Sequence, residues 1–239
     1  MKRTAILLAA LLPVLSMAQG DASPLLLVMG GKAATTPWYQ AGGAPAPVAV
    51  YVPKGAASQA ASYSNLVSTA HTLIESNLPP TWTANVGWTG QTTADSTKIG
   101  LLTDLIPGSN WTVIIAFSNA TQPSFQYGCL IGENSTTARC SVWPFASPAF
   151  WAVSYGNGGY QSAATIMGGV IANAGGNAYL NGTFFGNTGV WTGSATRPLT
   201  IFGENGLGYP ARADVKSVAI YAATLTSNQQ AAVYSAMPK

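Results

Sequence analysis

Charged residues are scarce in this sequence, and their scarcity excludes some kinds of partner. Only 7% of the 239 residues are Asp, Glu, Lys or Arg, against roughly 25% in an ordinary soluble protein. The net charge of +3 includes Lys2 and Arg3 at the N-terminus. Such a surface lacks the clustered positive charge that holds phosphate backbones. No nucleic-acid partner is therefore expected, and the surface should be neutral and rich in hydroxyl groups.

Histidine is almost absent, which limits nucleophilic and metal chemistry. His71 is the single histidine, and no nucleophile-elbow pattern accompanies it, so a solvated loop histidine is the favoured interpretation. Zinc needs more ligands than one histidine and two cysteines at hairpin spacing supply.

Acidic residues are few and singly placed. There are seven, at Asp21, Glu75, Asp95, Asp104, Glu133, Glu204 and Asp214. Glycoside hydrolysis needs two carboxyl groups that face each other across a groove. Glu133 and Glu204 are the candidates if acids from separate strands converge. The sequence therefore favours a protein that is not an enzyme, with a glycoside hydrolase as the less favoured alternative.

Cysteine is limited to Cys129 and Cys140. If the segments around them pair as a long-looped hairpin, the two sulfurs could meet in a disulfide, which would suit an oxidising compartment. The alternative is a pair of buried thiols on adjacent strands.

The N-terminus has the composition of a secretory signal. Lys2 and Arg3 precede an apolar run from Ala5 to Leu15, and the small residues around Ala18 form a cleavage site before Gln19. The run is too short to span a bilayer. Residues 1–18 are thus predicted to be a signal peptide, or else an apolar arm that packs on a neighbour in an assembly. Residues 19–47 are rich in Gly, Ala and Pro and are predicted to be a linker, followed by one domain over residues 48–239.

Short β-strands are predicted throughout that domain. Alternating apolar positions, enriched in β-branched and aromatic residues, recur between clusters of Gly, Pro, Asn and Ser. The predicted strands are Val48–Val52, Ala84–Trp88, Trp111–Ser118, Gln126–Ile131, Ala138–Trp143, Phe150–Tyr155, Gly169–Asn173, Ala178–Leu180, Thr183–Phe185, Leu199–Gly203 and Asp214–Tyr221. This spacing is typical of an all-β sandwich or barrel.

Two local signals stand out beside the strands. Asn181-Gly182 accepts positive φ at both positions, which predicts a two-residue hairpin. Thr226 and Gln229 have the spacing of a capping box and predict a short C-terminal helix that closes before Pro238. A second short helix is predicted within Ala56–Asn65.

The C-terminal segments resemble a known family. Leu199–Gly203, Ala213–Tyr221 and Leu225–Tyr234 resemble the closing signature of LamG-like jelly rolls of the concanavalin A-like lectin/glucanase superfamily. Ala178–Thr183 and Trp111–Phe117 are similar to that family's hairpin and early core strand. Upstream, the segments Pro37–Gly43 and Val52–Leu66 also resemble the lead-in of uncharacterised LamG-like proteins from bacteriophage and environmental genomes.

The resemblance implies an antiparallel two-sheet β-sandwich of the jelly-roll kind, and it says little about the ligand. Domains of this family often hold Ca²⁺ at the rim through carboxylate, Asn and backbone oxygens. Glu204, Asn205 and Asp214 are the corresponding candidates here, while a turn or strand-edge role is the alternative for Asp214.

Aromatic residues supply the remaining functional hypothesis. Rings stack on the apolar faces of sugars while amides bond the hydroxyl groups. The candidates for ligand contact are Trp143, Tyr160 and Trp191, which adjoin turns, together with Asn157. The alternative is that the rings fill the core.

These observations predict a carbohydrate-binding or adhesion module that recognises a glycan or cell-surface polysaccharide without cleaving it. It is expected to be secreted or displayed on a phage virion and not to span a membrane. The alternative is a structural virion protein, such as a capsid decoration or tail component, that docks on neighbouring subunits through its N-terminal arm.

Overall fold

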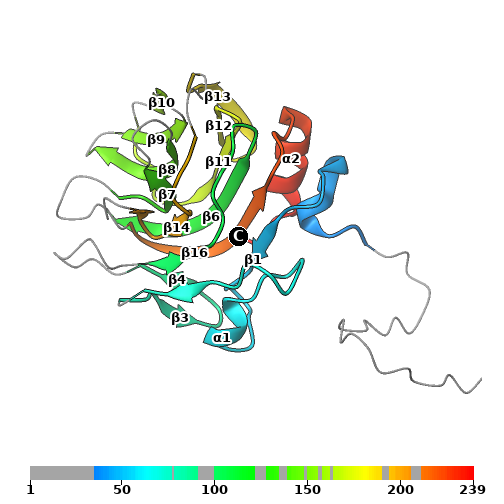
Figure 1. The fold of residues 1–239 in the computed structure, drawn as a ribbon, viewed down its shortest axis with the longest axis vertical. Coiled ribbons are helices and arrows are strands. Elements are labelled where there is room, and N and C mark those ends of the chain that lie inside the picture. Colours follow the sequence, from blue (N-terminus) through cyan, green and yellow to red (C-terminus); the bar gives the residue numbers. More distant parts are fainter. Residues whose placement is uncertain are drawn as a thin grey trace, which may run out of the picture. The chain divides into compact units, whose positions relative to one another are not determined.

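Two antiparallel sheets face each other in this protein (Figure 1). The computed structural model describes residues 35–239 except residue 77 and residues 91–99, 122–127, 135–138, 148–149, 156–157, 162–163, 190–193 and 206–210. The compact unit spans Thr36–Lys239. Residues 36–47, predicted as linker, therefore belong to the domain.

The first sheet is built around the two longest strands, β6 and β16. Its order is β13 (Thr183–Asn187), β12 (Asn177–Leu180), β11 (Gly169–Ala174), β6 (Thr112–Thr121), β16 (Arg212–Tyr221), β4 (Gly87–Thr89) and β3 (Thr81–Thr83). β1 (Ala49–Tyr51) also pairs with β16, beyond the residues that pair with β4.

The second sheet lies opposite the first. Its order is β10 (Gly158–Gln161), β9 (Phe150–Tyr155), β8 (Arg139–Ser147), β7 (Ile131–Asn134), β14 (Thr200–Ile201), β5 (Leu101–Leu102) and β2 (Ile74–Glu75). β15 (Glu204–Asn205) runs parallel to β7. Every predicted strand overlaps an observed one, and the predicted β-sandwich is confirmed. The short strands β2, β3, β5, β10 and β15 were not predicted.

The core lies between the sheets and continues on the outer side of the first sheet. Val113, Ile115 and Phe117 of β6 face the second sheet, whereas Ile114 and Ala116 belong to a separate buried cluster. That cluster includes residues of the helix α2 (Ser227–Ala236), and the 3-10 helix η1 (Trp38–Gly43) packs against it (Figure 1). Because Val113–Phe117 of β6 is buried on both faces, this part of the strand is continuously apolar.

Both strong local predictions are confirmed. Asn181 and Gly182 have φ of 51° and 76°, which fits the turn between β12 and β13. At the start of α2, the Thr226 hydroxyl accepts from the backbone N–H of Gln229, and the Gln229 side chain accepts from the backbone N–H of Thr226. The helix α1 (Gln59–Ser62) is shorter than predicted and is capped by Ser58.

Of the two alternatives for the cysteines, the structure agrees with two buried thiols, because Cys129 and Cys140 are both buried and no disulfide joins them. Cys140 belongs to the core between the sheets, whereas Cys129 packs with Trp143 and Ala152 in a separate cluster. Trp143 is three residues beyond Cys140 on the same strand, so the two cysteines lie on opposite faces of the second sheet.

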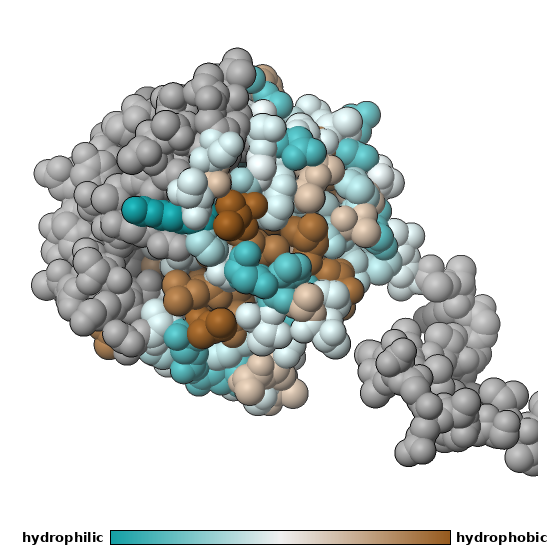
Figure 2. Space-filling model, in the orientation of Figure 1, coloured by the Kyte–Doolittle hydropathy of each residue, from teal (hydrophilic) through white to brown (hydrophobic). Residues whose placement is uncertain are grey.

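On the face shown in Figure 2, many of the coloured residues are pale, of intermediate hydropathy. This agrees with the small charged fraction of the chain. Apolar side chains are interspersed with polar ones on the face shown. Among the described residues, no helix has the length and apolar character needed to cross a membrane.

Candidate functional site

A polar pocket lies on the first sheet where β4, β6 and β16 meet. It has a volume of about 430 Å³ and is lined by Thr89, Asn119, Thr121, Arg212, Ala213 and Asp214. We call it the Asp214 pocket. Strand pairing brings these residues together from three parts of the chain, because Asp214 lies opposite Thr89 on β4 and opposite Ser118 on β6. Its volume falls within the range of small-molecule sites, about 300–1,000 Å³.

The Asp214 carboxylate is the central group of this pocket. Its side chain is 7% exposed. Oδ1 accepts a hydrogen bond of 2.6 Å from the Thr89 hydroxyl, and Oδ2 accepts one of 2.6 Å from the Asn119 side-chain amide. A carboxylate has about four acceptor positions, so these two bonds leave part of its capacity unused.

Irregular backbone at the strand ends directs these side chains. The pairing of β16 with β6 shifts register between Arg212 and Asp214, and such a bulge re-aims the side chains beside it. Asn119 has φ of 52°, a left-handed conformation that asparagine tolerates better than most residues. The register shift and the left-handed backbone of Asn119 together place the Asn119 amide against the Asp214 carboxylate.

Gly90, which follows β4, fixes the backbone beside the pocket. Its N–H donates to the Ala213 carbonyl at 2.9 Å. A Cβ at this position would lie 2.2 Å from the Ala211 carbonyl oxygen and 2.5 Å from the Phe202 ring. Only glycine allows this close approach of the chain after β4 to the chain before β16.

Arg212 is the one basic residue among the described residues of the pocket lining. It is exposed, and in the part of the chain that the structure describes its guanidinium makes no hydrogen bond or ion pair. The Asp214 oxygens are held by the neutral groups of Thr89 and Asn119 instead. The pocket therefore offers a positive and a negative group separately, together with neutral donors and acceptors.

The described donors do not fit the calcium ion that the family resemblance implied. Calcium needs six to eight oxygen ligands, yet both Asp214 oxygens accept hydrogen bonds and the Arg212 guanidinium lines the same pocket. Glu204 and Asn205 lie in β15 of the second sheet, whereas Asp214 lies in the first. Among the described residues, no three His, Cys, Asp or Glu side chains form a metal-binding group.

Of the predicted ligand contacts, only the Trp143 side chain lies in the described part of the chain, and it does not line this pocket. Trp143 is a correction: its ring is 5% exposed and its indole N–H donates to the Ser141 hydroxyl at 2.7 Å, so it is a packed residue and not a surface platform. Tyr160 lies in β10 opposite Val153 of β9, and its side chain lies outside the described part. Asn157 and Trp191 also lie outside the described residues.

The two acids considered for hydrolysis are on adjacent strands but do not pair. In the register of β15 with β7, Glu204 lies opposite Gly132 and Asn205 lies opposite Glu133. Glu133 is 0% exposed, and its neighbour Cys140 on β8 belongs to the core between the sheets. Glu133 is therefore an interior residue and does not line an open groove.

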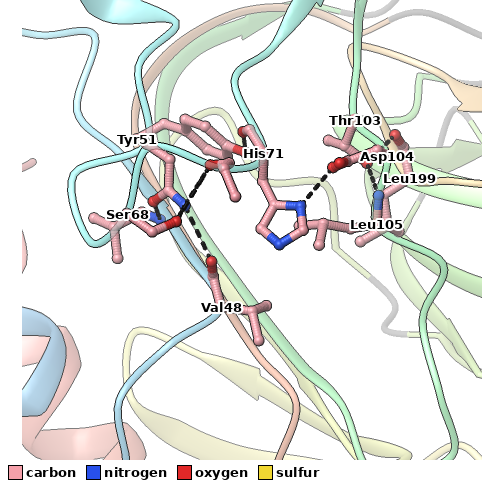
Figure 3. A network of polar contacts seen from close by, with 11 residues as sticks. Val48, Tyr51, Ser68, His71, Thr103, Asp104, Leu105 and Leu199 are labelled. Atoms are coloured by element: carbon pink, nitrogen blue, oxygen red, sulfur yellow. Dashed lines mark hydrogen bonds and ion pairs between the residues drawn. The ribbon is translucent and has the colours of Figure 1, made fainter.

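A second polar site surrounds His71 (Figure 3). His71 Nδ1 lies 2.7 Å from Asp104 Oδ1, and both side chains are partly exposed. The backbone carbonyl of His71 accepts a 2.5 Å hydrogen bond from the Tyr51 hydroxyl. Burial raises the pKa of Tyr51 well above its usual value, and the negative charge of Asp104 raises it further. The expected solvated histidine thus has an acidic neighbour that the sequence did not reveal.

Sequence reasoning found Asp214 but missed the residues around it. Thr89 and Asn119 are 125 and 95 positions away from Asp214 along the chain. Arg212 is two residues from Asp214, and the pair of opposite charges was the one signal available in the local sequence.

Solved structures with a similar fold come from carbohydrate-active enzymes. Trypanosoma rangeli sialidase, in complex with sialic acid, matches with a TM-score of 0.55 and 14% identity, covering 80% of this chain and 33% of that chain. This protein thus spans about a third of the length of that sialidase. No protein-family model matches the sequence, and no curated protein matches it.

A second structure matches as a whole domain. Domain 4 of AbnA, a GH43 extracellular arabinanase from Geobacillus stearothermophilus, in complex with arabinotriose, has a TM-score of 0.54 and 13% identity. The match covers 79% of this chain and 98% of that domain. At such identities the comparison establishes the β-sandwich fold and no more.

Proposed function

We propose that this chain is a non-catalytic carbohydrate-binding module that works outside the cell and binds its ligand in the Asp214 pocket. The pocket itself carries the proposal. A buried carboxylate, an amide and two threonine residues converge on one volume of about 430 Å³, and these groups match the alternating donors and acceptors of sugar hydroxyls. The chain also has few charged residues that would compete for those groups.

The comparison with domain 4 of the arabinanase supports this proposal. That domain was solved with arabinotriose and is matched over 98% of its length, so a separate domain of this fold holds a saccharide. The LamG-like closing segments of the sequence point to the same superfamily.

The absence of catalysis is proposed from the carboxyl groups of the pocket. Asp214 is the one acid among the described residues that line it, whereas glycoside hydrolysis uses two. If the protein instead releases reducing sugars from a polysaccharide, and Asp214→Asn or Glu133→Gln abolishes the release, it is a hydrolase and this part of the proposal fails.

The test measures the binding of two variants to a glycan array, and each variant removes the charge of one carboxylate. The Asp214→Asn variant should lose the signal of the native protein, because the charged acceptor at the centre of the pocket is gone. The matched control is Asp104→Asn, the same chemical change on an exposed acid outside the pocket, and it should keep the signal. Equal signals from all three proteins would show that the ligand binds elsewhere, and no signal from any would refute carbohydrate binding.

The extracellular location is proposed from the predicted signal at residues 1–18. Mass spectrometry of the mature protein should find Gln19 as the first residue, in material recovered outside the producing cell. Recovery of the chain with Met1 intact from purified virus particles would instead support the structural virion role.

A further inference from the structure

The Arg212 guanidinium points to the chemical class of the sugar. It lines the Asp214 pocket and makes no hydrogen bond or ion pair in the described part of the chain. Arginine presents a planar fork of donors that matches the two oxygens of a carboxylate.

The structure keeps the two charges of the pocket apart. Arg212 and Asp214 are two residues apart on β16, a spacing that normally places side chains on one face. Here the register shifts between them, so Arg212 lies opposite Thr121 and Asp214 lies opposite Ser118. The neutral donors of Thr89 and Asn119 occupy the Asp214 oxygens. Because Asp214 does not neutralise the guanidinium, its charge is available to a ligand.

The size of the pocket suits one sugar residue. Arg212 and Asp214 line one volume of about 430 Å³, which is within the range of small-molecule sites. A ligand that reaches both Arg212 and Asp214 therefore needs an acidic group at one side of the ring and hydroxyl groups at the other. Asn119 and Thr121 lie on β6 beside these positions and supply further polar contacts.

We propose that the Asp214 pocket binds a saccharide that carries a carboxylate, as in a uronic acid. The Arg212 guanidinium binds the carboxylate of the sugar. The hydroxyl groups of the same sugar ring donate to Asp214 and form hydrogen bonds with Asn119 and Thr121. This inference rests on the proposed function. It adds the charge of the ligand and makes Arg212 the residue that selects for it.

The test measures binding to uronic-acid oligosaccharides, made from galacturonate, glucuronate and mannuronate, against the same oligosaccharides with methyl-esterified carboxyl groups. Esterification removes the charge and keeps the hydroxyls and linkages. The free acids should bind about 10- to 100-fold more tightly, the range expected for hydrogen bonds to a charged group. Their affinity should also fall as salt is added.

Variants at Arg212 separate the charge from the rest of the pocket. Arg212→Gln should lose the preference, so that the free acids and the esters bind with similar affinity. Arg212→Lys, which keeps the charge, should restore part of the preference. The matched control is Arg197→Gln, which removes the same charge at a residue outside the pocket lining and should keep the preference.

Three outcomes would overturn the inference. Equal or tighter binding of esterified or neutral glycans, with Arg212→Gln unaffected, would leave the proposed function standing and remove the acidic selectivity. Complete displacement of the sugar by an equal concentration of inorganic phosphate would show a general anion site. No binding to any glycan, acidic or neutral, would remove the proposed function as well.

Discussion

Asn65 and Asp214 are polar side chains of equal burial, each 7% exposed, but they have different partners. The Asn65 carbonyl oxygen accepts from the backbone N–H groups of Val50 and Val67. Its amide donates to the Val48 and Ala70 carbonyls and to the Ser68 hydroxyl. Asn65 thus uses its whole hydrogen-bonding capacity, mostly on the backbone, to attach the loop after α1 to β1.

Asp214 uses only part of its capacity, and both of its partners are side chains that line the same pocket. Burial alone therefore does not distinguish a structural polar group from a functional one. A group that is saturated by backbone partners holds the fold. A group with unused acceptor positions that face an open volume is available to a ligand.

The largest expected effect tests the structural side of this comparison. Asn65→Ala should destabilise the protein by about 3 kcal/mol, because several buried backbone groups lose their partner. Urea unfolding would measure the loss. Glycan binding per folded molecule should not change. The control is Ser68→Ala, which removes one exposed partner of Asn65 and should lower the free energy of unfolding by about 0.5 kcal/mol or less. A loss of binding in folded Asn65→Ala would contradict the separation of the two regions.

Asp214→Asn should affect binding more than stability, which is the opposite of the result expected for Asn65→Ala. The N–H group of the new amide would face the N–H of Asn119 or the O–H of Thr89, and two donors cannot bond each other. We therefore expect the free energy of unfolding to fall by about 1–2 kcal/mol, less than for Asn65→Ala. Binding of the glycan should fall at least about tenfold, since hydrogen bonds to a charged acceptor are the stronger ones. Calorimetric titration and urea unfolding on the same sample give both numbers. A large stability loss with unchanged binding would make Asp214 a second structural residue.

The same contrast explains what the sequence could predict. The strands, the turn at Asn181-Gly182 and the cap at Thr226 follow from periodicity and local chemistry, so neighbouring residues determine them. The Asp214 pocket depends on partners about a hundred positions away in sequence and on a register shift in β16, which no local pattern encodes.

The sequence left open whether Cys129 and Cys140 meet, for a related reason. The hairpin spacing does not determine which face of the sheet each cysteine occupies, and Leu130 and Ile131 both belong to the core between the sheets. Alternation is therefore broken next to Cys129, and this residue lies on the other face from Cys140. Trp143 failed because a position near a turn does not ensure exposure in a two-layer fold.

An intermediate effect is expected at Tyr51, near the Asn65 loop. Tyr51→Phe removes the hydrogen bond to the His71 carbonyl and should cost about 1 kcal/mol at neutral pH. Because burial raises the pKa of Tyr51, and raises that of Tyr63 to about 12, both hydroxyls stay protonated in the folded state. The stability they contribute is present below pH 10 and is lost as the pH rises toward 12. Between pH 9 and pH 12, the free energy of unfolding should therefore decline less steeply in Tyr51→Phe than in the native protein. An identical slope in the two proteins would contradict this assignment.

The smallest effect is expected at the exposed carboxylate, Asp104, which completes the comparison with Asp214. Its contact with His71 is short, but the two side chains are 32% and 63% exposed for His71 and Asp104, respectively, so water and salt screen the charges. Asp104→Asn should change stability by about 0.5 kcal/mol or less and should leave glycan binding intact. Repeating the urea unfolding at high salt should reduce even that difference. If Asp104→Asn instead loses more than about 1 kcal/mol of unfolding free energy, independently of salt, then exposure does not explain the difference between Asp104 and Asp214. The geometry of their partners alone would then decide their roles.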